Sequence, residues 1–147
     1  MRKLLSLAVC FFLTINIFAQ TYSTEQKRLI SDISSYLSKE GYSPEEQKDG
    51  LKFRSEGTNY YVEVSSEDKS PMFLRLCRYV RFSDEIKPEK AVNELNSYNA
   101  KLAVKVSSTD NGLVLASEMF VRKQSDFTDV FPTLLMLIKA TYQQITE

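Results

Sequence analysis

The stretch Glu94–Val106, ELNSYNAKLAVKV, runs from a helical pattern into a strand and places two asparagines just before the change. Asparagine is a poor residue inside a helix, because its amide competes for nearby backbone groups, but it is useful where a helix ends. We expect Asn99 to bond the last free carbonyls of the helix, or to take the left-handed turn that redirects the chain. Asn96 is placed to bridge to the adjoining strand. A structural role for both amides is favoured over a role in gripping a ligand.

The segments on either side of this stretch extend the pattern. Pro88 suits the first turn of the preceding helix, where its missing amide hydrogen would be unpaired in any case. After the stretch, strands are predicted over 104–109 and 113–122. The turn Asp110-Asn111-Gly112 joins them and is the strongest short-range hairpin signal in the chain.

The first helix is marked at both ends. Ser23-Thr24-Glu25-Gln26 has the form of a capping box, in which a hydroxyl and a glutamine bond each other's backbone amides. Apolar residues then recur at helical spacing, and Gly41 stands where a left-handed stop belongs.

Between the two helices the apolar period falls to two residues. Strands are predicted within 42–47, 51–54, 60–65 and 72–82, with turns at Asp49-Gly50 and Gly57. A closing amphipathic helix is expected from Phe127 to Ile145, and Pro132 can delay its regular part to Thr128 or Asp129. The sequence therefore predicts one α+β domain in the order α-β-β-β(-β)-α-β-β-α, with five to six antiparallel strands and three helices.

The first twenty residues, MRKLLSLAVCFFLTINIFAQ, have the pattern of an export signal. Arg2 and Lys3 form a positive start, an apolar run follows, and Ile17-Phe18-Ala19 offers a cleavage site. We expect a signal peptide over 1–19 and a domain over 20–147 that is periplasmic or secreted. An uncleaved membrane anchor and a lipoprotein modified at Cys10 are less favoured, because the apolar run is short and continues past Cys10.

The charge and cysteine content limit the partners and the redox chemistry. Nineteen basic and nineteen acidic residues are interspersed. This pattern argues against nucleic acid as a partner, which would need a basic stripe. Only Cys77 remains after signal cleavage, so the mature domain has no internal disulfide. A buried strand cysteine is favoured over a reactive thiol.

Several kinds of active site lack their usual residues. The sequence contains no histidine, and its four glycines lie far apart. The histidine-based triads, the commonest transition-metal ligand and a glycine-rich phosphate loop are therefore missing, and a single mature cysteine cannot build a thiolate zinc site. We predict no enzyme, no cofactor and no metal site.

The longest predicted strand presents two different faces. Its even positions, from Met72 to Phe82, are apolar apart from Arg78 and are expected to face the core. Its odd positions are Phe73, Arg75, Cys77, Tyr79 and Arg81, and Val114, Ala116 and Phe120 would extend this row if the final hairpin pairs beside it. Such a face needs cover. The cover comes either from the second helix and loops or from a protein partner, for which Phe73, Arg75, Tyr79, Arg81 and Phe120 would be the interaction residues, most simply in a homodimer.

The ordered motifs resemble the YbjN family of proposed bacterial sensory transduction regulators. The resemblance covers roughly Thr24 to Ile145 and rests on Leu95-Asn96-x-x-Asn99 before a strand and an Asn-Gly turn, on Gly41-Tyr42, and on Asp49-Gly50-Leu51-Lys52-Phe53. It implies a fold similar to that of the class I type III secretion chaperones and brings no catalytic residues. Those chaperones work in the cytoplasm, so an exported domain departs from their role.

Together these observations predict an exported, non-enzymatic domain that binds another protein or itself. The alternative is a periplasmic carrier or sensor of a small apolar ligand held between the sheet and the closing helix, where Leu135, Met136 and Leu137 supply extra apolar positions. An apolar pocket would favour the carrier, and an exposed aromatic patch over a solid core would favour the protein binder.

Overall fold

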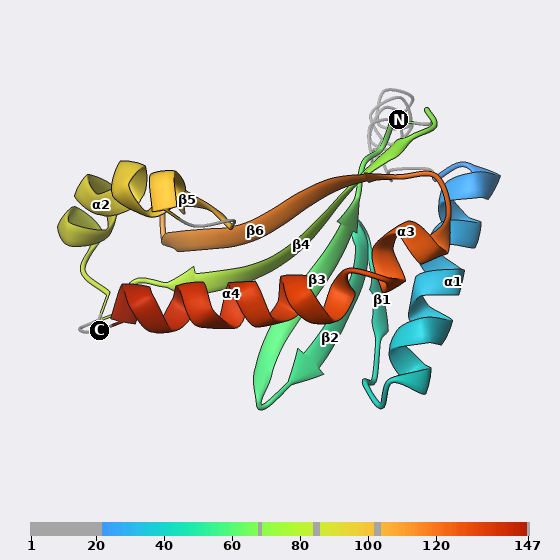
Figure 1. Ribbon diagram of the computed structural model, residues 1–147, viewed down its shortest axis with the longest axis horizontal. Helices are drawn as coiled ribbons and strands as arrows, with labels where there is room; N and C mark the ends of the chain where they lie inside the picture. Colours follow the sequence, from blue (N-terminus) through green and yellow to red (C-terminus); the bar gives the residue numbers. More distant parts are fainter. Residues whose placement is uncertain (1–21, 68, 84–85, 102–103, 147) are drawn as a thin grey trace, which may run out of the picture.

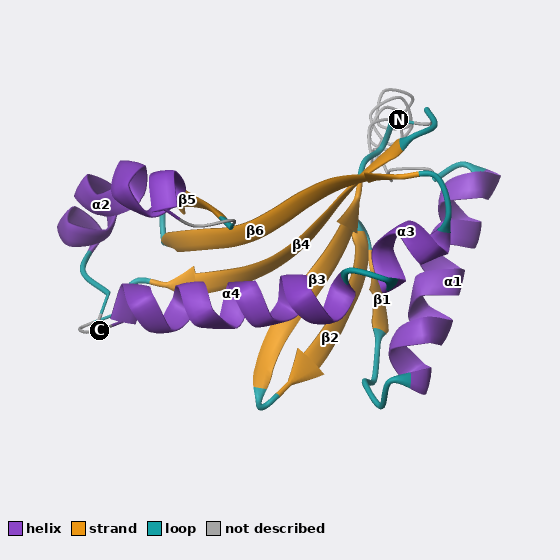
Figure 2. Cartoon of the chain, in the orientation of Figure 1, coloured by secondary structure: helices purple, strands orange, loops and turns teal. Residues whose placement is uncertain are grey.

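The computed structural model describes residues 22–67, 69–83, 86–101 and 104–146. The expected signal peptide over 1–19 and the expected mature start at Gln20 lie outside these residues. The elements follow in this order: α1 (Thr24–Lys39), β1 (Glu45–Gln47), β2 (Gly50–Ser55), β3 (Thr58–Val64), β4 (Met72–Arg81), α2 (Pro88–Lys101), β5 (Lys105–Thr109), β6 (Gly112–Val121), α3 (Gln124–Thr128) and α4 (Phe131–Thr146). Figures 1 and 2 show the arrangement. The predicted α+β fold is confirmed.

The strands form a six-stranded antiparallel sheet in the order β1-β2-β3-β4-β6-β5. The first four strands make a meander, and the chain then passes through α2 before the β5–β6 hairpin returns to the sheet. β6 pairs with β4 along its whole length, from Met72 opposite Val121 to Arg81 opposite Gly112. The two longest strands therefore lie side by side, and β5 forms the edge of the sheet beyond β6.

Both ends of α1 are fixed as the sequence predicts. The Ser23 hydroxyl accepts a hydrogen bond from the Gln26 amide at 3.2 Å, and the Gln26 side chain accepts one from the Ser23 amide at 2.7 Å. At the other end Gly41 has a φ of 88°, and the amides of Gly41 and Tyr42 donate to Ser38 and Leu37. This is the Schellman arrangement, in which orphan carbonyls of the last turn are satisfied.

Two glycines illustrate different reasons for glycine in the sheet. Gly57 (φ 80°) follows Glu56 (φ 49°) in the two-residue turn between β2 and β3, and two positive φ values in succession are the mark of a type I′ hairpin. Gly112 has no such φ, but a Cβ there would lie 1.9 Å from the carbonyl oxygen of Val80 on β4. The turn Asp110-Asn111-Gly112 is therefore confirmed, and its glycine serves close strand approach.

The core lies on one side of the sheet, under the helices. In Figure 1 α4 runs along the sheet in front of β3 and β4, and α1 and α3 lie beside each other at one end. The buried cluster combines the even positions of β4 with residues of the helices, including Ile33 of α1, Phe127 of α3 and Ile138 of α4. The exception in the row, Arg78, places its guanidinium carbon 3.4 Å from the centroid of the Tyr142 ring on α4. A cation over an aromatic face accommodates the charge.

The closing segment differs from the prediction of one helix beginning by Asp129. It contains the short helix α3, and the long helix α4 begins only at Phe131. Pro132 therefore falls in the first turn of α4, where a residue without an amide hydrogen costs no hydrogen bond. Phe127 is buried from α3. Among the described helices none is long and apolar enough to span a membrane.

Candidate functional site

The five predicted interaction residues lie on one side of the sheet, opposite the core. We call this side the outer face and define it by the odd positions of β4 from Phe73 to Arg81 and the even positions of β6 from Gly112 to Phe120. It also includes Asn59, Tyr61 and Glu63 of β3 and Lys105 of β5. Strand register brings these residues together, since Phe73 pairs with Phe120, Arg75 with Glu118 and with Glu63, and Tyr79 with Val114. Arg81 is exposed at the end of β4.

Two aromatic pairs stand on the outer face. The rings of Phe73 and Phe120 meet edge to face with centroids 5.5 Å apart, and those of Tyr61 and Tyr79 do so at 5.2 Å. Phe120 is 67% exposed and Tyr79 is 47% exposed, while Phe73 is half-buried. Rings of this size are usually covered in a soluble monomer unless a partner uses them.

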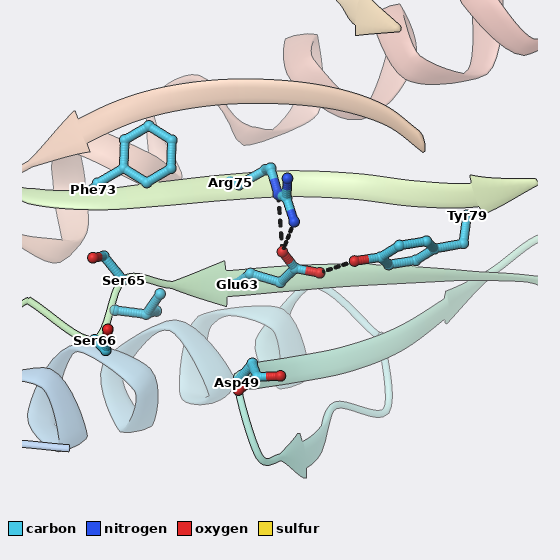
Figure 3. A pocket seen from close by; sticks show the side chains of 8 residues that line it. Asp49, Glu63, Ser65, Ser66, Phe73, Arg75 and Tyr79 are labelled. Carbon is cyan, nitrogen blue, oxygen red and sulfur yellow. Dashed lines mark hydrogen bonds and ion pairs between the residues drawn. The ribbon is translucent and has the colours of Figure 1, made fainter. Parts of the chain in front are cut away.

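Between the aromatic pairs, Glu63 is the centre of a polar network. Its carboxylate accepts hydrogen bonds from the Arg75 guanidinium, with the Nε donor at 2.8 Å, and forms an ion pair with the same group. The Tyr79 hydroxyl donates to the other oxygen at 2.5 Å, and the Cys77 thiol lies 3.4 Å from it. Three residues of β4 therefore converge on one carboxylate of β3, as Figure 3 shows for Arg75 and Tyr79.

The environment keeps the acidic donors of this network protonated. Burial raises the pKa of the Cys77 thiol, and the nearby carboxylate of Glu63 raises it further. Burial and the hydrogen bond to Glu63 likewise raise the pKa of Tyr79. Cys77 is fully buried and is not disulfide-bonded. A neutral buried thiol is a poor nucleophile, so the predicted structural cysteine is confirmed as a buried strand residue.

Beside the network the surface forms a shallow depression of about 450 Å³. Figure 3 shows it between the start of β4 and the end of β3. Its lining mixes charged, hydroxyl and aromatic side chains: Asp49, Glu63, Val64, Ser65, Ser66, Phe73, Arg75 and Tyr79. The lining is less apolar than that of a pocket built to enclose a small hydrophobic ligand. In the part of the chain that the structure describes, no three metal-ligating side chains gather.

The comparisons with known proteins bear on the fold. No family model matches the chain, and no curated protein matches it either. Among solved structures, the crystal structure of YbjN from E. coli, described as a proposed transcription regulator, matches with a TM-score of 0.52. The sequences are 16% identical, and the match covers 78% of this chain and 93% of that chain. This chain has a YbjN-like fold.

The C-terminal end of α2 carries the two asparagines, Asn96 and Asn99, that the sequence places before a strand. Asn99, in the last turn of α2, donates from its amide nitrogen to the Val106 carbonyl at 2.9 Å and accepts from the Val106 amide at 2.6 Å. The side chain thus satisfies both backbone groups that Val106 presents at the free edge of β5. Asn99, rather than Asn96, makes the bridge to the strand, because it lies one turn nearer to it. Asn96 is exposed on α2.

The three α4 residues considered as contacts of an apolar ligand, Leu135, Met136 and Leu137, differ in their burial. Leu135 is buried in the core and Leu137 packs against it, whereas Met136 points away and is 59% exposed. Leu135 and Leu137 therefore pack between the sheet and α4.

Glu63 was missed as a site residue by sequence reasoning. The alternation along β3 places Glu63 on the face of the sheet away from the buried residues Val62 and Val64. From the sequence it was one of many charged residues expected to face solvent. Its role depends on the β3–β4 register, which sets Glu63 beside Arg75. The available signal was the paired alternation of two neighbouring strands, with a carboxylate on one and an arginine on the other.

Proposed function

We propose that this chain is an exported, non-enzymatic domain that binds a protein through its outer face. The observation that carries the proposal is the exposed aromatic surface: Phe120 and Tyr79 are the large aromatic residues exposed on this face, and both belong to the sheet rather than to a loop. Aromatic and arginine side chains are enriched where proteins meet. A rigid sheet holds Phe73, Phe120 and Tyr79 at fixed spacing, so little entropy is lost when a partner covers them.

The similarity to YbjN supports a regulatory role that is exerted through binding. YbjN is described as a proposed transcription regulator. Basic and acidic residues are balanced in this chain, and Arg75 and Lys105 of the outer face already pair with Glu63 and Glu118. Such a surface suits a protein better than nucleic acid, whose phosphates need unpaired cations.

Export is part of the proposal and rests on the sequence of residues 1–19. The mature protein should begin at Gln20, which the intact mass of the protein recovered from the periplasm or medium would show. A retained Met1 or a lipid on Cys10 would contradict an exported soluble domain.

A pair of matched variants tests the binding face. Phe120→Ser removes an exposed ring from the outer face, and Met136→Ser removes a similarly exposed apolar side chain from α4. Neither residue is in the core, so each variant should melt close to the wild type. We expect Phe120→Ser to weaken self-association or partner binding at least tenfold, measured by analytical ultracentrifugation and by binding to the co-purified partner, while Met136→Ser leaves it unchanged. Equal binding by both variants would contradict the proposal.

A further inference from the structure

The outer face changes character along β4 and β6 in a regular way. Strand register arranges its residues in rows across the two strands. The first row holds two large rings, Phe73 and Phe120. The middle row holds two small buried residues, Cys77 and Ala116, and the last row holds Arg81 and Gly112. The rows between them hold Arg75 with Glu118 and Tyr79 with Val114. The two phenylalanine rings of the first row and the pair Arg81 and Gly112 of the last row therefore lie at equal distances from the middle row.

We propose that the partner of the outer face is a second copy of this chain, docked face to face. The β4 strands of the two copies run antiparallel, and the two-fold axis lies between the two faces, along the Cys77–Ala116 row. This inference rests on the proposed function and specifies its partner. In this arrangement Phe120 lies over Gly112 of the second copy, and Phe73 lies under Arg81 of the second copy. Each large ring thus meets either a residue without a side chain or a guanidinium, which stacks well on aromatic faces. A two-fold interface must be complementary to itself. This face meets the condition at its ends, because Phe73 and Phe120 lie as far from the middle row as Arg81 and Gly112 do.

The opposite alignment, with the two copies of β4 parallel, is disfavoured by the same residues. A two-fold axis along the strands between β4 and β6 would set Phe73 against Phe120 of the second copy at one end and Arg81 against Gly112 at the other. The large rings of both copies would then crowd together at one end. The antiparallel alignment instead sets each ring against Arg81 or Gly112. Both alignments keep the strands of the two sheets within about 30° of each other, so the placement of the rings decides between them.

Charges near the middle of the face do not oppose the arrangement. Arg75 is paired with Glu63, and the Lys105 ammonium lies 3.4 Å from Glu118. The two copies of Lys105 face each other across the axis, each beside its own Glu118. Arg75 would face Tyr79 of the second copy, because the two lie at equal distances on either side of Cys77. Glu63 would face Asn59 of the second copy, since Asn59 lies on β3 as far beyond the middle row as Glu63 lies before it.

The area of the outer face determines the affinity expected for the dimer. β4 and β6 each have 10 residues. At about 3.3 Å per residue and about 4.8 Å between strands, three neighbouring strands cover roughly 500 Å² of each copy. Stable complexes usually bury about 800 Å² on each partner. The dimer should accordingly be weak and dependent on concentration, and it is best examined near 100 µM, well above a dissociation constant on the order of micromolar.

Pulsed electron–electron spin resonance distinguishes the alignments. In a Cys77→Ala background, a spin label is placed either at Lys105→Cys, in the middle row on β5, or at Thr109→Cys, four residues further along the same strand. About the proposed axis, two Lys105 labels face each other without offset, while two Thr109 labels are offset by about 26 Å along the strands. The expected result is a dimer with a clearly longer distance for Thr109 than for Lys105. Sedimentation of the Cys77→Ala chain must first give the wild-type molecular mass.

The other outcomes separate this inference from the proposed function. A dimer with the same distance at both positions would overturn the antiparallel arrangement. A chain that is monomeric near 100 µM, but whose Phe120→Ser variant loses a co-purified partner, would overturn the second copy and leave the outer face as a protein-binding surface. A monomer in which Phe120→Ser changes no interaction would overturn both.

Discussion

Removal of the Asn99 amide should destabilise the domain through the edge of β5. Asn99→Ala deletes two hydrogen bonds, one from the Val106 amide at 2.6 Å and one to its carbonyl at 2.9 Å. Each is worth about 0.5–1.5 kcal/mol net, which gives about 1–3 kcal/mol for the pair. Alanine recovers up to about 0.7 kcal/mol because it is a better helix former. Water can also reach the edge beside the exposed Asn99, so the net loss should be about 1 kcal/mol.

Urea unfolding followed by circular dichroism measures this loss. With a slope of about 2 kcal/mol per molar urea, the midpoint should fall by about 0.5 M without a change in slope. Asn96→Ala is the matched control, because Asn96 is exposed one turn earlier on the same helix. It should be neutral or slightly stabilising. Asn99→Asp should be worse than Asn99→Ala at neutral pH, since a carboxylate oxygen would then face the Val106 carbonyl.

Two results would refute this reasoning. If Asn99→Ala and Asn96→Ala unfold at the same urea concentration, the bridge to Val106 contributes nothing. If Asn99→Ala melts like the wild type but loses a ligand or partner, the amide serves binding rather than structure.

Other substitutions test the core, the strand contacts and the polar network. Phe53 is 1% exposed and stacks on Tyr60, so Phe53→Ala should lower the free energy of unfolding by about 3–5 kcal/mol in the same urea assay; a loss below 1 kcal/mol would contradict the core described. Gly112→Ala should cost about 3 kcal/mol or more, because its Cβ meets backbone, whereas Gly41→Ala meets no atom within 4 Å and should cost only about 1–2 kcal/mol for its positive φ; equal losses would argue against the close approach at Gly112. Tyr79 has a raised pKa in the folded chain, so the unfolded chain loses this proton first and stability falls as pH rises above about 10; Tyr79→Phe should lessen that alkaline loss in a pH series of melting curves, and an unchanged pH profile would count against the network.

Local sequence signals predicted the elements because each depends on nearby residues. The capping box at Ser23 and the stop at Gly41 act within one turn of α1, and the two-residue periodicity of β4 sorts its side chains before any partner strand is known. The start of the long closing helix was placed too early, at Thr128 or Asp129 instead of Phe131. The burial of Phe127 in a separate helix depends on packing against the rest of the core.

The sequence identified only the part of the candidate site that depends on nearby residues. Alternation along β4 showed that Phe73, Arg75, Tyr79 and Arg81 share a face. The network around Glu63 and the bridge from Asn99 to Val106 instead join residues on different elements. Their partners follow from strand register and from the position of α2, which no local pattern encodes.

Hydroxyl-radical footprinting of the protein in its native cell compartment tests most directly whether the outer face is a binding surface. The oxidation rates of Phe120 and Met136 are measured by mass spectrometry there and again for the purified chain at high dilution, where both side chains are exposed. Phe120 should become strongly protected in the native compartment while the rate at Met136 stays the same. Equal rates at Phe120 under both conditions would show that no partner covers the outer face.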